Sequence, residues 1–201
     1  MTMQPKPLLF EALDGISEKT ISIHHDKLYT GYVAKENEIS EKLYALREAG
    51  KFTDANQTYS ELRALKDGET FASNGVYLHE GYFEILGGDG NPEGELADAL
   101  IKKYGSMEIF QSYFSACGMA ARGWTILVWD AHVSALRIIN ADAHNQGGVW
   151  GCIPLLVLDV YEHAYFIDFG SDRKAYIAAW WKNLDWKKIE ATYQKAKQIA
   201  L

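Results

Sequence analysis

The feature that most constrains this sequence is a carboxylate and an imidazole at the end of an apolar segment. Residues 153–160 are almost wholly apolar and predict a buried β-strand. Asp159 lies near the end of this segment, and His163 follows within the run Asp159-Val-Tyr-Glu-His163. This spacing puts both side chains within reach of one metal ion. Because Asp and His recur at this distance by chance, the run indicates a metal site only together with further ligands.

The first half of the chain has a helical pattern. Its apolar residues recur at helical spacing and predict helices over residues 17–48 and 71–86. Residues 54–65 are expected to form a second, polar helix or part of one. Ser17 is placed to open the first helix and Gly50 to follow its end. Lys66-Asp67-Gly68 predicts a turn between the second and third helices, and Gly87-Gly88 ends the third.

The second half mixes helices and strands. Helices are predicted over 96–104, from Ser106, over 175–184 and from Trp186, and strands over 124–129, 133–139 and 153–160. A turn at 130–132 makes the first two strands a hairpin. The pattern predicts an α+β fold, in which an N-terminal helical hairpin precedes a C-terminal domain with a small three-stranded antiparallel sheet covered by helices.

A glycine-rich stretch, residues 87–94, is the expected domain boundary. Residues 1–88 would form a helical domain containing His24 and His79. Residues 89–201 would form an α/β domain containing Asp159 and His163.

Charge and composition exclude several classes of partner. The formal net charge of −7 argues against nucleic acid. No apolar run approaches the roughly 20 residues of a membrane helix, and residues 1–9 show no export signal. Cys117 and Cys152 are too few for a disulfide framework, which favours a reducing compartment. We therefore expect a cytoplasmic protein with no nucleic-acid or membrane partner.

Three histidines complete a ligand set with Asp159. His24, His79 and His163 all lie in apolar or aromatic surroundings. Three imidazoles and one carboxylate suit a redox-active first-row metal and do not suit calcium or magnesium. Any one of these histidines could instead be a buried side chain with ordinary hydrogen bonds, but the four positions together favour a metal site.

Three motifs resemble those of the iron/manganese superoxide dismutases. The run from Ile21 to Val33 is similar to the family's first-helix motif, in which the first His of a pair binds the metal and a later Tyr, here Tyr32, guards the substrate entrance. Residues 74–79 resemble the second helix, which carries the second ligand. Residues 155–165 resemble the family's signature run, with Tyr161 where Trp is usual.

The resemblance extends from about residue 8 to residue 195 and implies an activity. We expect a superoxide dismutase with one manganese or iron ion per subunit, held by His24, His79, Asp159 and His163. Such an enzyme converts the superoxide anion to oxygen and hydrogen peroxide by cycling the metal between two oxidation states. Tyr32 is the expected gateway residue; its alternative role is helix packing.

The residue that tunes the metal is ambiguous. One branch of the family takes a Gln from the position of Gly75, which disfavours that branch here. The other branch takes it from the loop after the second strand, where an ungapped count gives His144 and a gapped one gives Gln146. We prefer His144 as the second catalytic residue, although it could be a solvated loop residue. Gly75 leans slightly to manganese, and use of both metals is compatible with His144.

Further positions are expected around the metal by the same resemblance. Aromatic side chains that could wall the site are Tyr82, Trp124, Tyr161 and Trp181. Arg173 is the favoured residue for steering the anion, ahead of Lys27 and Lys174.

The resemblance also implies a homodimer. In the family a Glu at the position of Glu162 reaches the ligand His of the partner, here His163; the alternative is an ion pair within its own chain. Leu28 and Phe166 stand where the family usually has a His and a Tyr that hydrogen-bond across this interface. Because both are apolar, we expect the dimer to persist without that outer proton relay, for which Tyr29 could substitute.

Two other functions compete with this interpretation. The first is a hydrolase or oxygenase that uses the same ligands, although oxygenases typically use two His and one carboxylate. The second is a non-catalytic metal-binding protein on the same fold. The complete ligand set and Tyr32 argue against the latter.

Overall fold

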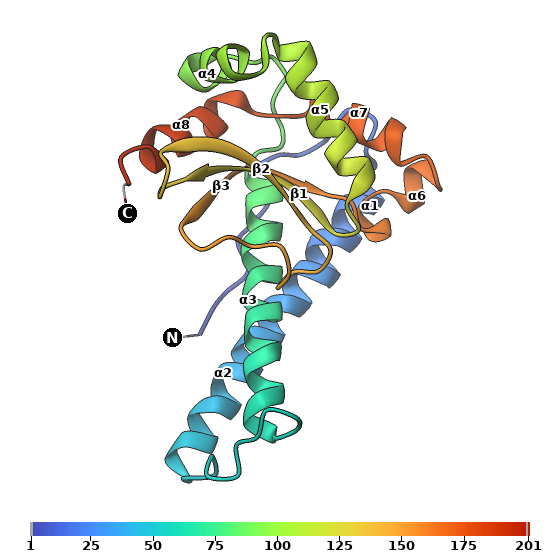
Figure 1. The fold of residues 1–201 in the computed structure, drawn as a ribbon. Helices are drawn as coiled ribbons and strands as arrows, with labels where there is room; N and C mark the ends of the chain where they lie inside the picture. The colour runs from blue at the N-terminus through green and yellow to red at the C-terminus, as the bar shows by residue number, and fades with distance from the viewer. Residues whose placement is uncertain (1, 200) are drawn as a thin grey trace.

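The computed structural model describes residues 2–199 and 201 and consists of a long helical hairpin that projects from a sheet covered by helices (Figure 1). The first arm of the hairpin is one continuous helical run made of α1 (Glu18–Ile23), η1 (His24–Tyr29) and α2 (Thr30–Glu48). Ser17 caps this run, accepting a hydrogen bond from the Thr20 N–H, as the sequence predicts. Segment η1 is a π-helix, a wide turn that is frequent at functional sites.

The second arm of the hairpin corrects the sequence prediction. A single helix, α3 (Glu61–Glu84), replaces the two helices expected over 54–65 and 71–86, and the expected turn at Lys66-Asp67-Gly68 is wrong. Gly68 costs a helix interior about 1 kcal/mol relative to Ala. A Cβ there would come 3.2 Å from Ile39 Cδ1, so the glycine lets α2 and α3 pack closely and tertiary packing overrides the turn signal.

The sheet has the predicted three antiparallel strands. They are β1 (Trp124–Asp130), β2 (Ala135–Ala141) and β3 (Cys152–Asp159), in the order β2-β1-β3. All of β1 is buried, as expected for the central strand. The register places Trp124 opposite Asp159, so one end of the sheet carries both side chains.

Helices cover this sheet and complete the α+β fold predicted from the sequence. They are α4 (Gly94–Tyr104), α5 (Met107–Ala120), α6 (Phe166–Phe169), α7 (Arg173–Lys182) and α8 (Trp186–Ala196), with the short 3₁₀ segment η2 (Glu162–Ala164) after β3. Figure 1 shows the far end of α3 passing against the sheet, while α4, α5, α7 and α8 gather on the side away from the hairpin. Strand β3 therefore meets α3 at the base of the hairpin.

Side-chain hydrogen bonds fix the irregular N-terminal segment to both parts of the fold. The buried Asn183 amide accepts from the Asp14 N–H (2.7 Å) and donates to Asp14 O (2.9 Å). Asn37 on α2 does the same for Met3, at 2.8 and 3.0 Å.

Across residues 2–199, no helix is long and apolar enough to span a bilayer.

Candidate metal centre

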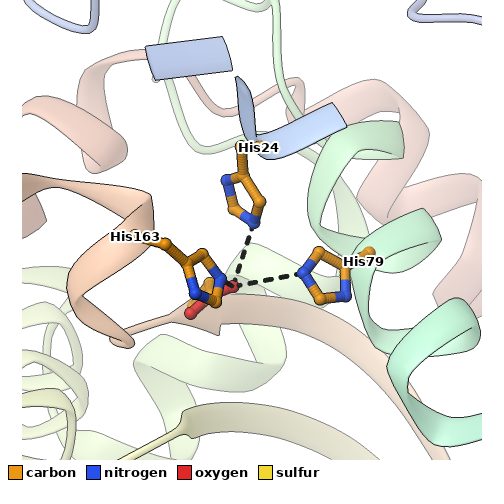
Figure 2. Close-up of side chains that lie close together, drawn as sticks. His24, His79 and His163 are labelled. Carbon is orange, nitrogen blue, oxygen red and sulfur yellow. Dashed lines mark hydrogen bonds and ion pairs between the residues drawn. The ribbon is translucent and has the colours of Figure 1, made fainter. Parts of the chain in front are cut away.

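Four side chains from four separate segments converge where the hairpin meets the sheet. His24 begins η1, His79 lies on α3, Asp159 ends β3 and His163 lies in η2. One potential ligand atom from each lies within 4.8 Å of all the others. Figure 2 shows the three imidazoles pointing toward one another from their different elements. The four ligands expected from the sequence are thus brought together.

The orientation of these side chains fits a bound cation. His24 Nε2 and His163 Nε2 each lie 3.1 Å from Asp159 Oδ2, and His79 Nε2 lies 3.7 Å from the same oxygen. The His79 Nδ1–H donates to Gly75 O at 2.5 Å, which leaves the Nε2 lone pair facing the cluster. This nitrogen is buried without a hydrogen-bond partner in the described part of the chain. A buried, unpartnered lone pair beside a carboxylate fits a metal ion.

Electrostatics favour the metal-binding protonation states of three ligands and oppose that of the fourth. Burial lowers the pKa of His24, and lowers that of His79 to about 3. Burial opposes ionisation of Asp159, but the charge and hydrogen bonds of His163 and His24 hold the pKa of this carboxyl below its usual range. Neutral imidazoles and an ionised carboxylate are the forms that coordinate metals. Burial acts to lower the pKa of His163, but the charge and hydrogen bond of Asp159 raise it, so metal binding must displace the His163 proton.

His144 lies beside this cluster, with its ring centroid 5.8 Å from that of His79. The Trp124 Nε1–H donates to His144 Nδ1 at 3.0 Å. Because an indole N–H can only donate, Nδ1 is the acceptor and the neutral ring carries its proton on Nε2. Burial lowers the pKa of His144 to about 4, so this neutral form prevails at neutral pH. Gln146, the alternative, is exposed in the same loop.

Tyr32 packs against the space that Gly75 leaves open. A Cβ on Gly75 would lie 2.7 Å from Tyr32 Cδ1, so the ring occupies its position only because residue 75 has no side chain. The Tyr32 ring lies 5.2 Å from His79 and 4.7 Å from His144, between centroids. Burial, and then the charge of Asp159, raise the pKa of its hydroxyl. The phenol therefore stays protonated beside the cluster.

Three of the four expected aromatic walls contact the ligands. Tyr82 lies 5.0 Å from His24, Trp124 lies 5.1 Å from His79, and Tyr161 stacks on His163 at 5.3 Å, between ring centroids. The Tyr161 backbone N–H also donates to Asp159 Oδ1 at 2.9 Å. These rings pack directly against the ligand histidines, and the Tyr161 N–H holds the carboxylate in one orientation.

Trp181 is a correction to the sequence expectation. Its ring packs on Phe110 and Phe114 of α5, and its Nε1–H donates to Ser115 Oγ at 2.9 Å. Among the described residues no ring contact joins it to a ligand histidine. A hydrogen-bond acceptor on α5 therefore turns this side chain away from the metal centre.

Sequence reasoning missed three side chains of the site. Phe83 lies 5.0 Å from His24, and Phe71 lies 4.6 Å from His144, between ring centroids. The Tyr176 hydroxyl donates to Asp159 O at 2.8 Å. Helical spacing from His79 on α3 could have indicated Phe83, whereas no local pattern marks Tyr176.

Arg173 is tied to the fold by its guanidinium. The group donates to Tyr165 Oη at 3.3 Å and to Ala121 O at 2.7 Å. Ala121 directly follows the last residue of α5. This end of α5 carries partial negative charge, which a cation stabilises. Lys27 and Lys174 are exposed.

Glu162 and His163 have unsatisfied groups on the protein surface. Glu162 is exposed, and no ion pair joins it to another described residue. His163 uses Nε2 toward Asp159, while its Nδ1 has no hydrogen-bond partner within residues 2–199. Phe166, nearby in the chain, is 55% exposed, and Leu28 is half-buried. Tyr29 donates its hydroxyl proton to Glu80, which leaves it none for a substitute relay.

Two models of known protein families match this chain. A family model described as "Iron/manganese superoxide dismutases, alpha-hairpin domain" matches residues 2–87, and one described as "Iron/manganese superoxide dismutases, C-terminal domain" matches residues 92–192. The chain belongs to the iron/manganese superoxide dismutase family. The hairpin and the sheet domain of this dismutase family member each contribute two of the four clustered side chains.

Curated relatives of this dismutase family member are named for both metals. A "Superoxide dismutase [Fe]" of Aquifex pyrophilus is 42% identical over 197 residues, covering 96% of this chain and 92% of the relative. A "Superoxide dismutase [Mn] 2" of Haloferax volcanii is 36% identical over 200 residues, covering 98% and 97%. A "Superoxide dismutase [Fe]" of Pyrobaculum aerophilum is 34% identical over 209 residues, which cover 100% of this chain and 96% of the relative.

Replacing either His79 or Asp159 by Ala should abolish metal retention. Deleting one of four protein ligands opens the site to water, so we expect the metal content after dialysis to fall by about tenfold or more. Elemental analysis of purified protein measures this. His132→Ala, at an exposed histidine outside the cluster, is the matched control and should keep its metal. Wild-type metal content in Asp159→Ala would exclude Asp159 as a ligand.

Proposed function

We propose that this protein is a superoxide dismutase with one iron or manganese ion held by His24, His79, Asp159 and His163. The observation that carries the proposal is the convergence of three imidazoles and one carboxylate, with ligand atoms within 4.8 Å, in a member of this family. Dismutation converts two superoxide anions and two protons into one molecule of oxygen and one of hydrogen peroxide. When bound, the metal supplies the electron transfer by alternating between two oxidation states.

The chain itself supplies the protons and their positions. The Tyr32 hydroxyl and the His144 Nε2–H are the polar groups proposed to hold protons beside the cluster, because both rings contact His79. Trp124 holds His144 in the tautomer that donates. The pair is suited to deliver protons to a bound anion without a strong internal base.

Access to the site is limited by aromatic side chains. Tyr32, Phe71 and Tyr161 all lie within 6.1 Å of His144 or of one another, between ring centroids. Such a wall admits a small anion and excludes larger molecules. We retain Arg173 as the proposed steering residue. Its guanidinium is held in place by the Ala121 carbonyl oxygen, which is neutral and so leaves the positive charge available to attract an anion.

The choice of metal is part of the proposal. Gly75 favours manganese slightly by family resemblance, while His144 is compatible with both metals. Curated relatives carry both metals in their names, which supports a site able to use either. A reducing, cytoplasmic location is proposed because Cys117 and Cys152 are unpaired.

A homodimer completes the proposed enzyme. Glu162 of each subunit would accept a hydrogen bond from His163 Nδ1 of its partner, and a two-fold axis would produce this contact twice. Glu162 is exposed and His163 Nδ1 accepts and donates no hydrogen bond, and neither group has a partner among the described residues, which supports this contact. A carboxylate on Nδ1 fixes the imidazole tautomer and strengthens Nε2 as a ligand. Leu28 and Phe166 would then contribute apolar area to the interface.

The decisive experiment compares the metals on one protein. We expect protein reconstituted with manganese alone, or with iron alone, to remove superoxide in a zymogram, and the metal-free protein not to. Hydrolytic activity without superoxide removal would favour a different metalloenzyme. Bound metal without either activity would favour a non-catalytic protein.

His144 should tune the metal more than Gln146 does. His144→Ala removes a buried donor, so we expect a change on the order of tenfold in the iron-to-manganese activity ratio, or a different resting oxidation state in the optical spectrum. Gln146→Ala, in the same loop but exposed, is the control and should leave both unchanged. The opposite ranking would assign the tuning role to Gln146.

Removing the Glu162 carboxylate should weaken assembly and metal binding together. Glu162→Ala is expected to dissociate at about tenfold higher protein concentration than wild type and to lose metal in the same sample, because the interface holds a ligand. Sedimentation and elemental analysis measure the two effects. A dimeric, fully metallated Glu162→Ala protein would show that Glu162 does not bridge the subunits.

A further inference from the structure

A second polar cluster lies behind the metal ligands and has no part in the chemistry described above. The Tyr29 hydroxyl, on a side chain only 1% exposed, donates to Glu80 Oε1 at 2.9 Å. The Lys6 backbone N–H donates to the Tyr29 oxygen at 2.9 Å. The Lys6 ammonium lies 2.5 Å from Glu80 Oε2. Tyr29 is therefore both a donor and an acceptor in a closed set of three residues.

The positions of Tyr29 and Glu80 in the chain connect this cluster to the metal centre. Tyr29 is the last residue of η1, the π-helix that begins with the ligand His24. Glu80 directly follows the ligand His79 on α3. The bond between them therefore joins the two ligand-bearing helices five residues from His24 and one residue from His79. The Tyr29 ring also stacks on His79, with centroids 6.5 Å apart.

The N-terminal segment closes over this junction. His25 Nε2 lies 2.8 Å from Lys6 O and donates its proton to it. The Lys6 backbone N–H and C=O thus both bind to side chains of η1, Tyr29 and His25. The Lys6 side chain binds to Glu80 on α3. Lys6 therefore bridges the two helices, and it lines the same cavity as Phe83, whose ring centroid lies 5.0 Å from that of His24.

Packing between the helices is incomplete on one side of this junction. A cavity of about 200 Å³ lies here, bounded by Lys6, His25, Tyr29, Glu80 and Phe83 among others. Side chains that face a void lose their contacts on that side and are held less firmly. The hydrogen bonds and the ion pair around Tyr29 join η1 to α3 beside this cavity, in addition to the packing of the Tyr29 ring.

We propose that Tyr29, Glu80 and Lys6 are positioning residues that fix the separation of His24 and His79 for the metal. The proposal rests on the metal site proposed above. The three residues touch neither substrate nor metal and act through the two helices. Their loss should alter the geometry of the bound metal and hasten its release while the fold persists.

Conservative variants of the metal-loaded protein test this role. Tyr29→Phe removes one hydroxyl, and Glu80→Gln removes the charge while keeping an acceptor. We expect both to change the electron paramagnetic resonance spectrum of the bound manganese or iron. We also expect metal loss to a chelator to be several-fold to about tenfold faster. Tyr77→Phe, at an exposed tyrosine of α3, and Glu84→Gln, at an exposed carboxylate beside the same cavity, are the matched controls.

A double variant and a conservative exchange sharpen the result. Tyr29→Phe/Glu80→Gln should release metal more slowly than the product of the two single effects predicts, because the two groups share one hydrogen bond. Lys6→Arg should behave as wild type and Lys6→Met should not.

A lower melting temperature with unchanged spectrum and metal release would show a merely structural role and overturn the proposal. Equal effects in the control variants would also overturn it. If Tyr29→Phe does not fold, Lys6→Met decides, since that side chain is exposed. None of these measurements uses superoxide, so absence of dismutase activity would refute the proposed function and leave this test intact.

Discussion

The fully buried carboxylate of Asp159 is the constraint on which the rest of the structure depends. A charge without water contact is costly unless cations or hydrogen-bond donors surround it. Here His24, His79 and His163 point nitrogen atoms at one of its oxygens, and the Tyr161 N–H binds the other. The hydrogen bonds to Oδ2 come from His24 on η1 and from His163 in the segment after β3, while His79 on α3 presents a lone pair, as a metal ligand would. Satisfying Asp159 therefore requires the hairpin to dock on the sheet.

The space beside Asp159 is shared by residues that depend on one another. Tyr32 can lie against α3 only because residue 75 is glycine, and Tyr32 in turn contacts the His144 ring. Trp124 holds His144 by a hydrogen bond and stands opposite Asp159 in the sheet register. A larger residue at position 75 would displace Tyr32 and, through it, His144. His144, the proposed tuning residue, therefore enters from the loop after β2, because Tyr32 already fills the space beside α3.

Local patterns in the sequence predicted most of the fold, and motifs predicted the ligands. Helical periodicity, the Ser17 cap and the apolar strands gave the elements and their order, because these depend on neighbouring residues. The patterns failed where distant contacts decide. Gly68 reads as a turn, yet packing on Ile39 makes it part of a helix. Ser115 on α5 turns Trp181 away from the metal centre, and the Tyr29–Glu80 bond joins residues that no periodic pattern relates.

The distance along the chain between the ligands has a consequence for biosynthesis. His24 and Asp159 are separated by 135 residues, and His163 follows still later. A ribosome-bound chain in which only the hairpin has been synthesised contains His24 and His79 but neither Asp159 nor His163. It therefore cannot bind the metal in this four-ligand geometry. Because the complete site exists only in the folded chain, metal affinity adds directly to folding stability. Truncated or half-folded copies are thereby prevented from carrying a redox-active ion at this site.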